Sequence, residues 1–399
     1  MRILHTADWH LGRIFQGVSL VDDQAVALAS FVEHVRDAQP DVVVLAGDVY
    51  DRAVPPPDAV ALLDEVLSEM TLDVRAPLLC ISGNHDSPDR LQVWGKLLEE
   101  RNVHLVGRLA RSKPVVFVDE WGPVSFHLLP FAEAGTIKET LRQDLVDDSD
   151  DGQLTPHQER YLERVGRAHG AALQAQITAT ANTLGDGRHV LVAHGSVDGS
   201  SETDSERSLW SKAGHAVDPQ CLLPFAYTAL GHHHSPQTFL GGKARYSGSL
   251  LPYSFSEAGQ QKSATLVDID GDGHVHLEER PLAMRRQVRV ERGTLHTLLH
   301  KARAAPSDDY IKVELDDSDS PIDPAGALKE HWPNLLVIER HRRLDEVVTT
   351  STPSKGPEEL STVDMVRSFF TDVDQPLHDD DVAVLQQLID DAVAQEHER

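Results

Sequence analysis

Five short motifs carry side chains suited to divalent metals, and each follows an apolar run. The motifs contain Asp8 and His10; Asp48; Asn84, His85 and Asp86; His194; and His232 and His234. Each apolar run is typical of a buried strand. Carboxylate, amide and imidazole groups together suit a hard or borderline divalent ion. Because ligands of layered α/β sheets lie beyond the carboxyl ends of the strands, the motifs predict a metal site there.

The number of donors predicts two ions. The expected ligands are Asp8, His10, Asp48, Asn84, His194, His232 and His234. Asp8 and His10 are two residues apart, so strand-like alternation would turn both to one side, and the same holds for His232 and His234. His233 would then face away and is left out. With Asp48 shared, two four-ligand shells result, and two ions roughly 3.5–4 Å apart can bind a phosphate and lower the pKa of a water.

The elements around these motifs indicate a layered α/β core. Strands are predicted at residues 3–4, 41–45, 77–81, 189–193 and 227–231. Helical spacing of apolar residues predicts helices at 22–36, 57–70 and 89–100. Strands that alternate with helices are typical of such a core. Cys80, inside the third apolar run, is expected to be a buried strand residue.

The middle of the chain has a different pattern. We expect an acidic loop at 144–151 and one long helix from 157 to about 183. Further strands are predicted at 238–240, 245–248, 263–269 and 274–280. The sequence Asp-Gly-Asp-Gly at 270–273 predicts a hairpin turn between the last two strands.

The domain organisation follows from a change of pattern near residue 281. A first domain would span 1–280, and a small βαβαβ module 281–345. In this module, strands are predicted at 287–291, 310–315 and 335–341, and helices at 294–304 and 324–331. Residues 346–360 are predicted to be a linker, and 361–399 a tail of two amphipathic helices. The apolar stripes of the tail favour docking on a partner; the alternative is packing on the first domain.

Composition limits the class of protein. The formal net charge of the 399 residues is −27 at pH 7, which argues against DNA binding by the field of the chain alone. Two divalent ions would reverse the field locally. The two cysteines give no disulfide framework. We expect no signal peptide, no membrane span and a cytoplasmic location.

Several longer stretches resemble a known family. They are residues 5–12 (HTADWHLG), 47–52 (GDVYDR), 205–207 (SER), 246–249 (YSGS) and 255–257 (FSE). With the order of the metal motifs, they resemble the calcineurin-type metallophosphoesterases and, within them, the bacterial SbcD nucleases related to the Mre nucleases. The likeness covers residues 1–280 well; the module and tail resemble these nucleases more in layout than in residues.

The resemblance implies a fold and a ligand set. The fold would be a four-layer αββα sandwich with a small α/β capping domain that selects DNA and a C-terminal helical tail. One ion would be held by Asp8, His10, Asp48 and His234, and the other by Asp48, Asn84, His194 and His232. Manganese is the usual metal, with magnesium or another divalent ion as the alternative. His85 would stabilise charge or protonate the leaving 3′ oxygen, held by Asp86.

The resemblance also implies an activity and partners. The activity would be hydrolysis of DNA phosphodiester bonds, as a double-strand exonuclease and a single-strand or hairpin endonuclease, in DNA repair, recombination and replication. The C-terminal helices would dock on an SbcC-like ABC-type ATPase, with a homodimer inside a nucleoid-associated heterotetramer. The chain has no Walker phosphate loop, so any ATP dependence would come from the partner. Asp51 replaces a histidine linked to exonuclease activity in some archaeal relatives, which leaves the balance of the two activities open.

Two other functions remain as alternatives. One is a phosphodiesterase or phosphatase for small molecules on the same fold, which would need neither the module nor the tail. The other is a scaffold without catalysis, which would be expected to lack a ligand or the histidine of the Gly-Asn-His-Asp motif. All of these residues are present.

Overall fold

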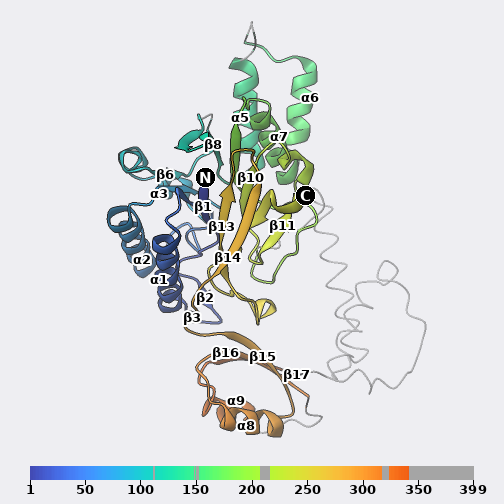
Figure 1. Ribbon diagram of the computed structural model, residues 1–399. Helices are drawn as coiled ribbons and strands as arrows, with labels where there is room; N and C mark the ends of the chain where they lie inside the picture. Colours follow the sequence, from blue (N-terminus) through green and yellow to red (C-terminus); the bar gives the residue numbers. More distant parts are fainter. Residues whose placement is uncertain (111–112, 148, 150–151, 207–215, 317–322, 341–399) are drawn as a thin grey trace, which may run out of the picture. The chain divides into compact units, whose positions relative to one another are not determined.

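The computed structural model describes residues 1–110, 113–147, 149, 152–206, 216–316 and 323–340, and its main body contains two six-stranded sheets (Figure 1). The first sheet has the order β14 (Val275–Pro281), β13 (Ser263–Ile269), β1 (Arg2–Thr6), β4 (Val42–Ala46), β5 (Leu78–Ile81), β6 (Val103–Val106). The second has the order β11 (Gln237–Phe239), β12 (Ala244–Tyr246), β10 (Tyr227–Gly231), β9 (Arg188–His194), β8 (Gly122–Leu129), β7 (Val115–Asp119). In each sheet four neighbouring strands are parallel.

The parallel strands are apolar without interruption because both of their faces are buried. In β4, Val42 and Val44 belong to the core between the two sheets, whereas Val43 and Leu45 belong to the core under the helices. The core between the sheets also contains Phe126 of the second sheet. The two sheets therefore pack face to face and form the two inner layers.

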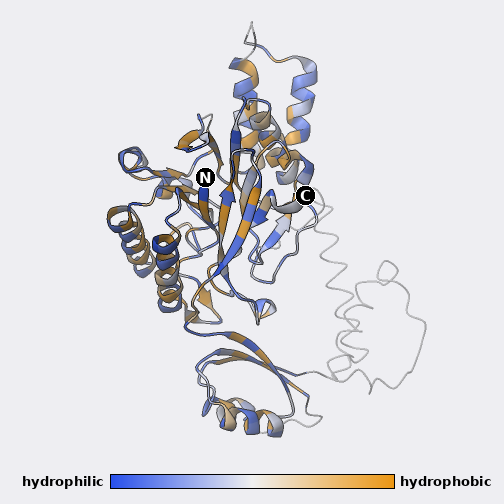
Figure 2. Ribbon diagram, in the orientation of Figure 1, coloured by the Kyte–Doolittle hydropathy of each residue, from blue (hydrophilic) through white to orange (hydrophobic). Residues whose placement is uncertain are grey.

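Helices form the two outer layers. They are α1 (Val21–Ala38) and α2 (Pro57–Ser68) over the first sheet, and α5 (Ala134–Asp147), α6 (Pro156–Val165) and α7 (His169–Ala181) on the side of the second. Phe31 of α1 shares a core with Val43, and Ile177 of α7 shares one with Leu191. Both α1 and α2 alternate apolar and polar residues along their length (Figure 2), as expected for helices with one buried face. The predicted αββα architecture is confirmed.

Two predicted helices are wrong in their extent. Instead of one helix at 89–100, there are two short helices, α3 (Pro88–Leu91) and α4 (Gly95–Leu98). Trp94 between them has the left-handed φ of 65°, which no α-helix continues through. The long helix predicted at 157–183 is α6 and α7, separated at Gly166. The acidic loop predicted from residue 144 is also wrong in part, because α5 continues to Asp147.

The remaining elements include strands that the pattern did not predict. β6, β7 and β8 were missed, although β7 and β8 form a regular antiparallel hairpin. The turn predicted at 270–273 is confirmed by the pairing of Ile269 with Val275. The smaller elements are β2 (Ile14–Phe15), β3 (Val18–Ser19), η1 (Glu69–Val74), η2 (Glu99–Arg101), η4 (Pro219–Leu222), η5 (Leu240–Gly242) and η6 (Phe255–Glu257).

The βαβαβ elements of the predicted module are confirmed. They are β15 (Val288–Gly293), α8 (Leu295–Ala304), β16 (Tyr310–Leu315), α9 (Pro324–Lys329) and β17 (Leu335–Arg340), with the three strands parallel. Trp332, Leu298 and Val313 are buried in its own core. The domain boundary near 281 stays a prediction. The linker at 346–360 and the tail helices at 361–399 lie outside the described residues. None of the helices in the described ranges has the length and apolar content needed to cross a membrane.

Candidate metal centre

The backbone that carries the first two candidate ligands is not extended. Asp8 and His10 follow β1 with φ of 53° and 45°, so the predicted strand-like alternation is wrong here. Their amides donate to the carbonyl oxygens of Gly47 (3.0 Å) and Asp48 (2.9 Å), which ties this loop to the one after β4. Gln24 of α1, fully buried, donates from Nε2 to the carbonyl oxygen of His10 at 2.8 Å. These contacts hold the left-handed conformations that L-residues otherwise disfavour.

Two glycines let the loops approach each other. A Cβ on Gly47 would lie 2.3 Å from Nδ1 of His194, and the φ of 90° at this position also favours glycine. A Cβ on Gly83 would lie 2.2 Å from Oδ1 of Asp48. The glycine before Asp48 and the glycine before Asn84 are therefore steric requirements of the candidate site.

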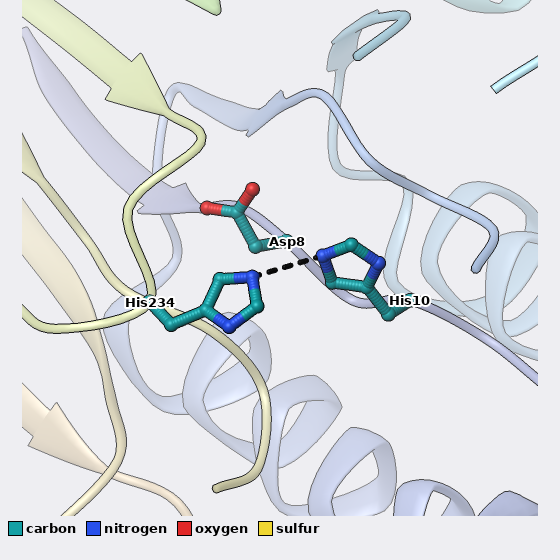
Figure 3. A group of neighbouring side chains, drawn as sticks. All are labelled: Asp8, His10 and His234. Atoms are coloured by element: carbon teal, nitrogen blue, oxygen red, sulfur yellow. Dashed lines mark hydrogen bonds between the residues drawn. The ribbon is translucent and has the colours of Figure 1, made fainter. Parts of the chain in front are cut away.

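The first cluster of donors consists of Asp8, His10 and His234 (Figure 3). One ligand atom from each lies within 4.8 Å of the others, and all three residues are buried. Nε2 of His10 is 3.1 Å from Nε2 of His234. Two ligands that bind one ion at about 2.1 Å and at right angles lie about 3 Å apart, so this spacing suits coordination.

The second cluster is centred on Asn84. Its Oδ1 lies 3.0 Å from Nε2 of His194 and 3.1 Å from Nδ1 of His232. Nδ1 of His194 donates to the carbonyl oxygen of Ala46 at 2.9 Å, which leaves Nε2 to face the cluster. An imidazole fixed in this way through its other nitrogen is the usual arrangement of a metal-binding histidine.

Asp48 lies between the two clusters. Its Oδ2 is 3.5 Å from Nε2 of His10 and 3.5 Å from Nε2 of His194, and its Oδ1 accepts from the amide of His85 at 2.8 Å. The structure thus brings all seven predicted ligands together at the carboxyl ends of β1, β4, β5, β9 and β10.

The charges of the site also fit bound cations. Burial opposes the ionised form of Asp48, but the neighbouring His194 holds the pKa of Asp48 well below its usual range. Conversely, despite burial, Asp48 raises the pKa of His194 to about 9. Burial, with a contribution from Asp48, raises the pKa of Asp8 well above its usual range. Two carboxylates at this depth repel each other, and a divalent cation would favour the ionised form of both.

His85 and Asp86 both lie at the site, and the contacts that hold them differ from the expected ones. Nδ1 of His85 lies 2.8 Å from the carbonyl oxygen of Asp51. The carboxylate of Asp86 accepts from the backbone amides of Val49 (3.1 Å), Tyr50 (2.9 Å) and Gly83 (2.9 Å). Asp86 therefore joins the loops after β4 and β5, and the carbonyl oxygen of Asp51 orients the ring of His85; the part of His85 in catalysis stays a prediction. Burial, aided by Asp48, raises the pKa of Asp86 to about 7.

Several polar residues of the site were not predicted as functional. Gln24 is the clearest, and its signal was a polar residue at a helix position that shares the apolar face of Leu28 and Phe31. Ser205 and Glu257 were noticed only within stretches that resemble a family. His233, which was left out, indeed bonds away from the donor clusters, through Nδ1 to Glu206 (2.8 Å) and Nε2 to Ser200 (2.8 Å).

A family model decides the classification of this site. The model described as calcineurin-like phosphoesterase matches residues 1–238, more than half of the chain. The chain belongs to this family. The metallophosphoesterase is therefore a hydrolase of phosphoesters, of a fold whose members use a dinuclear divalent metal site. A second model, SbcD_C, described as type 5 capsule protein repressor C-terminal domain, matches residues 284–374. The two matches together identify an SbcD-type member of the superfamily.

Three solved structures are among those that resemble this chain. TT1561 of Thermus thermophilus is 14% identical over 70% of this chain and 98% of its own, with a TM-score of 0.37. GAP50, the anchor in the inner membrane complex of Plasmodium, is 13% identical over 81% and 99%, with a TM-score of 0.38. A dimetal phosphatase from Danio rerio is 14% identical over 71% and 97%, with a TM-score of 0.38. At these scores, the structures add nothing to the family match.

Proposed function

We propose that this metallophosphoesterase is a manganese-dependent DNA nuclease, the SbcD-like subunit of an SbcCD-type complex. The observation that carries the proposal is the gathering of six candidate metal ligands around a seventh, Asp48, in a chain whose residues 284–374 match the SbcD_C model. The product of the reaction would be a DNA strand cut by hydrolysis of one phosphodiester bond.

The two clusters support the proposed ligand sets. Asp8, His10 and His234, with Asp48, would hold one ion, and Asn84, His194 and His232, with Asp48, the other. Mixed carboxylate, amide and imidazole donors fit manganese and exclude a structural zinc site of thiolates. When bound, such a pair of ions supplies Lewis acidity to a phosphate oxygen and lowers the pKa of a water.

The residues of the chain supply the rest of the chemistry. His85 lies against His10, with ring centroids 4.6 Å apart, and its Nδ1 is oriented by Asp51. Proton exchange with a leaving oxygen would therefore take place at Nε2 of His85. Nη1 of Arg13 donates to Oδ1 of Asp51 at 2.9 Å, so the residue whose carbonyl oxygen orients the ring is itself held in place. Asp86 holds the two loops together, so that the ligands reach the substrate already positioned.

DNA is favoured over a small substrate by the part of the chain beyond the first domain. A small phosphodiester can bind without a further domain. The SbcD_C match and the βαβαβ module suit a long substrate that contacts the protein at many points. Because the chain has a net charge of −27, the attraction for the phosphate backbone would come from the two ions and from a partner protein.

Cleavage assays with the full chain test this proposal. With Mn²⁺ we expect cleavage of a DNA hairpin, loss of cleavage with a chelator, and loss of cleavage in His85→Ala despite normal Mn²⁺ uptake. Hydrolysis of bis-p-nitrophenyl phosphate without any cut in DNA, with or without the ATPase partner, would instead favour a small-molecule phosphodiesterase. A chain that takes up no divalent ion would be a scaffold.

We also propose that residues 361–399 bind an SbcC-like ABC-type ATPase, with two copies of the nuclease in one heterotetramer. The SbcD_C match extends into this segment, to residue 374. Deletion of 361–399 should abolish co-purification with the ATPase and spare Mn²⁺-dependent cleavage of single strands. Complex formation by the truncated chain would place the partner surface elsewhere.

A further inference from the structure

Residues that are not candidate metal ligands hold the backbone of His234 and contact one nitrogen of its ring. Its amide donates to Oε1 of Glu206 at 2.8 Å. Its carbonyl oxygen accepts from Nζ of Lys262 at 2.9 Å and from the amide of Ser249 at 3.1 Å. Its ring Nδ1 lies 2.6 Å from Oγ of Ser205. Since the backbone is already held, the contact with Ser205 acts on the ring alone.

The partners of Glu257 determine which way the hydroxyl group of Ser205 donates its hydrogen bond. Oγ of Ser205 lies 2.6 Å from Oε1 of Glu257, a side chain with no exposed surface. The other partners of this carboxylate are donors as well: Oγ of Ser254 (2.8 Å), the amide of Tyr253 (3.2 Å) and Oγ1 of Thr203 (3.5 Å) at Oε1, and Nζ of Lys262 (2.6 Å) at Oε2. A carboxylate paired with a buried ammonium only accepts, so the hydroxyl of Ser205 donates to Glu257.

The tautomer of His234 follows from this direction. A hydroxyl has one hydrogen, and Ser205 uses it toward Glu257, so its oxygen accepts from Nδ1–H of the imidazole. Thr203, 2.9 Å from Ser205, can donate to the same oxygen. In this tautomer Nε2 of His234 carries the lone pair. It lies 3.1 Å from Nε2 of His10, within the group that also contains Asp8 (Figure 3).

We propose that Ser205 and Glu257 are positioning residues, which select the Nδ1–H tautomer of His234 and so present Nε2 to the metal. The inference rests on the proposed function only for the identity of the ion. It gives a role to Ser205 and Glu257, which lie in stretches of sequence, at 205–207 and 255–257, that the ligand set leaves unused. His194 has no such requirement, because the carbonyl oxygen of Ala46 selects its tautomer.

The tautomer can be measured without metal. In ¹⁵N-histidine-labelled full chain treated with chelator, we expect the His234 ring, assigned by its loss in His234→Asn, to show the Nδ1–H pattern. Ser205→Ala should shift it toward Nε2–H or a mixture, and Ser205→Thr should restore it. Ser254→Ala is the matched control, because it removes a donor to the same oxygen of Glu257 and leaves the contact with His234. Ser205→Cys replaces the alanine variant if that one does not fold.

Manganese titration is the second measurement. Loss of a partner that orients a ligand lowers metal affinity about tenfold to hundredfold, so Ser205→Ala should weaken one of two Mn²⁺ ions by that factor, and Ser254→Ala neither. An unchanged tautomer and unchanged Mn²⁺ affinity in Ser205→Ala overturn the inference and leave the proposed function intact. Wild-type protein that binds no Mn²⁺ overturns the proposed function, while the chelated spectra still decide the tautomer.

Discussion

Charged groups are buried at both ends of the central strands, but the partners of these groups differ between the two ends. At the amino ends, Asp119 accepts from the terminal amine of Met1 at 2.7 Å and from Nη2 of Arg188 at 2.5 Å. At the carboxyl ends, Asp8 and Asp48 lie among imidazoles, and Asp8 accepts only the backbone amide of His232 among the described hydrogen bonds. One end is an ion-paired cluster, and the other is a set of donors prepared for a cation.

The pKa shifts express the same difference. The hydrogen bond from Arg188 holds the pKa of Asp119 well below its usual range, whereas burial raises the pKa of Asp8 well above it. Asp8, Asp48 and His232 also have left-handed φ values, a conformational cost that the ion-paired end does not carry. The comparison teaches that Asp119 is neutralised by cationic groups of the chain, whereas the carboxylates of Asp8 and Asp48 have only backbone amides and imidazoles among their described partners and would be neutralised by a bound cation.

Removal of the shared carboxylate is expected to have the largest effect. Asp48→Asn should bind fewer than two Mn²⁺ ions, because Asp48 contacts both clusters. Hydrolysis should fall by at least about 10⁴-fold, since each ion supplies several kcal/mol of charge stabilisation. Metal analysis and a phosphodiesterase assay check this. Normal uptake of two ions by the variant would show that Asp48 is not shared.

His85→Ala separates catalysis from metal binding at the same end of the strands. Hydrolysis should fall about 10²–10³-fold, because a positioned acid or base is lost. Mn²⁺ stoichiometry should stay at the wild-type value, since the contacts of both donor clusters are kept. Titration calorimetry and turnover measured on one preparation test this. Wild-type turnover would exclude His85 from the reaction.

Asp119→Asn is expected to change stability and not metal binding. It leaves Arg188, which is 6% exposed, without its carboxylate, so the free energy of unfolding at pH 7 should fall by about 3 kcal/mol. A depressed pKa contributes stability above the ordinary value of 3.8 and loses it as the pH falls below that value. The difference from wild type should therefore be smaller at pH 3 than at pH 7 in urea unfolding. A change in Mn²⁺ affinity would break the separation of the two ends.

Asp268→Asn, at the same amino end, should have the smallest effect. Asp268 pairs with Arg2 at 2.9 Å, but the two side chains are 43% and 47% exposed. Water and salt screen such a pair, so the free energy of unfolding should change by less than about 1 kcal/mol, and by nothing measurable in high salt. A decrease in the free energy of unfolding as large as that of Asp119→Asn would mean that burial does not determine how much these ion pairs contribute to stability.

Much of this protein was determined by the sequence itself. Uninterrupted apolar runs such as β4 belong to strands buried on both faces, and polar donors directly after them collect at one edge for topological reasons. A layered α/β core and the gathering of seven polar side chains at one sheet edge could therefore be predicted from the pattern, whereas the αββα order of the layers came from the resemblance to a family. The break in the helix predicted at 89–100 could not be predicted, because the residue in the left-handed conformation is Trp94 and not a glycine.

Only the tertiary structure decided how the donors are held. Local alternation suggested that Asp8 and His10 point to one side, yet their orientation comes from contacts with Gly47, Asp48 and Gln24, which are distant in the chain. The partners of the rings, Asp51 for His85 and Ser205 for His234, likewise come from other loops. Sequence periodicity records which face of an element is buried, but a hydrogen bond between two loops depends on where the whole chain places both of them.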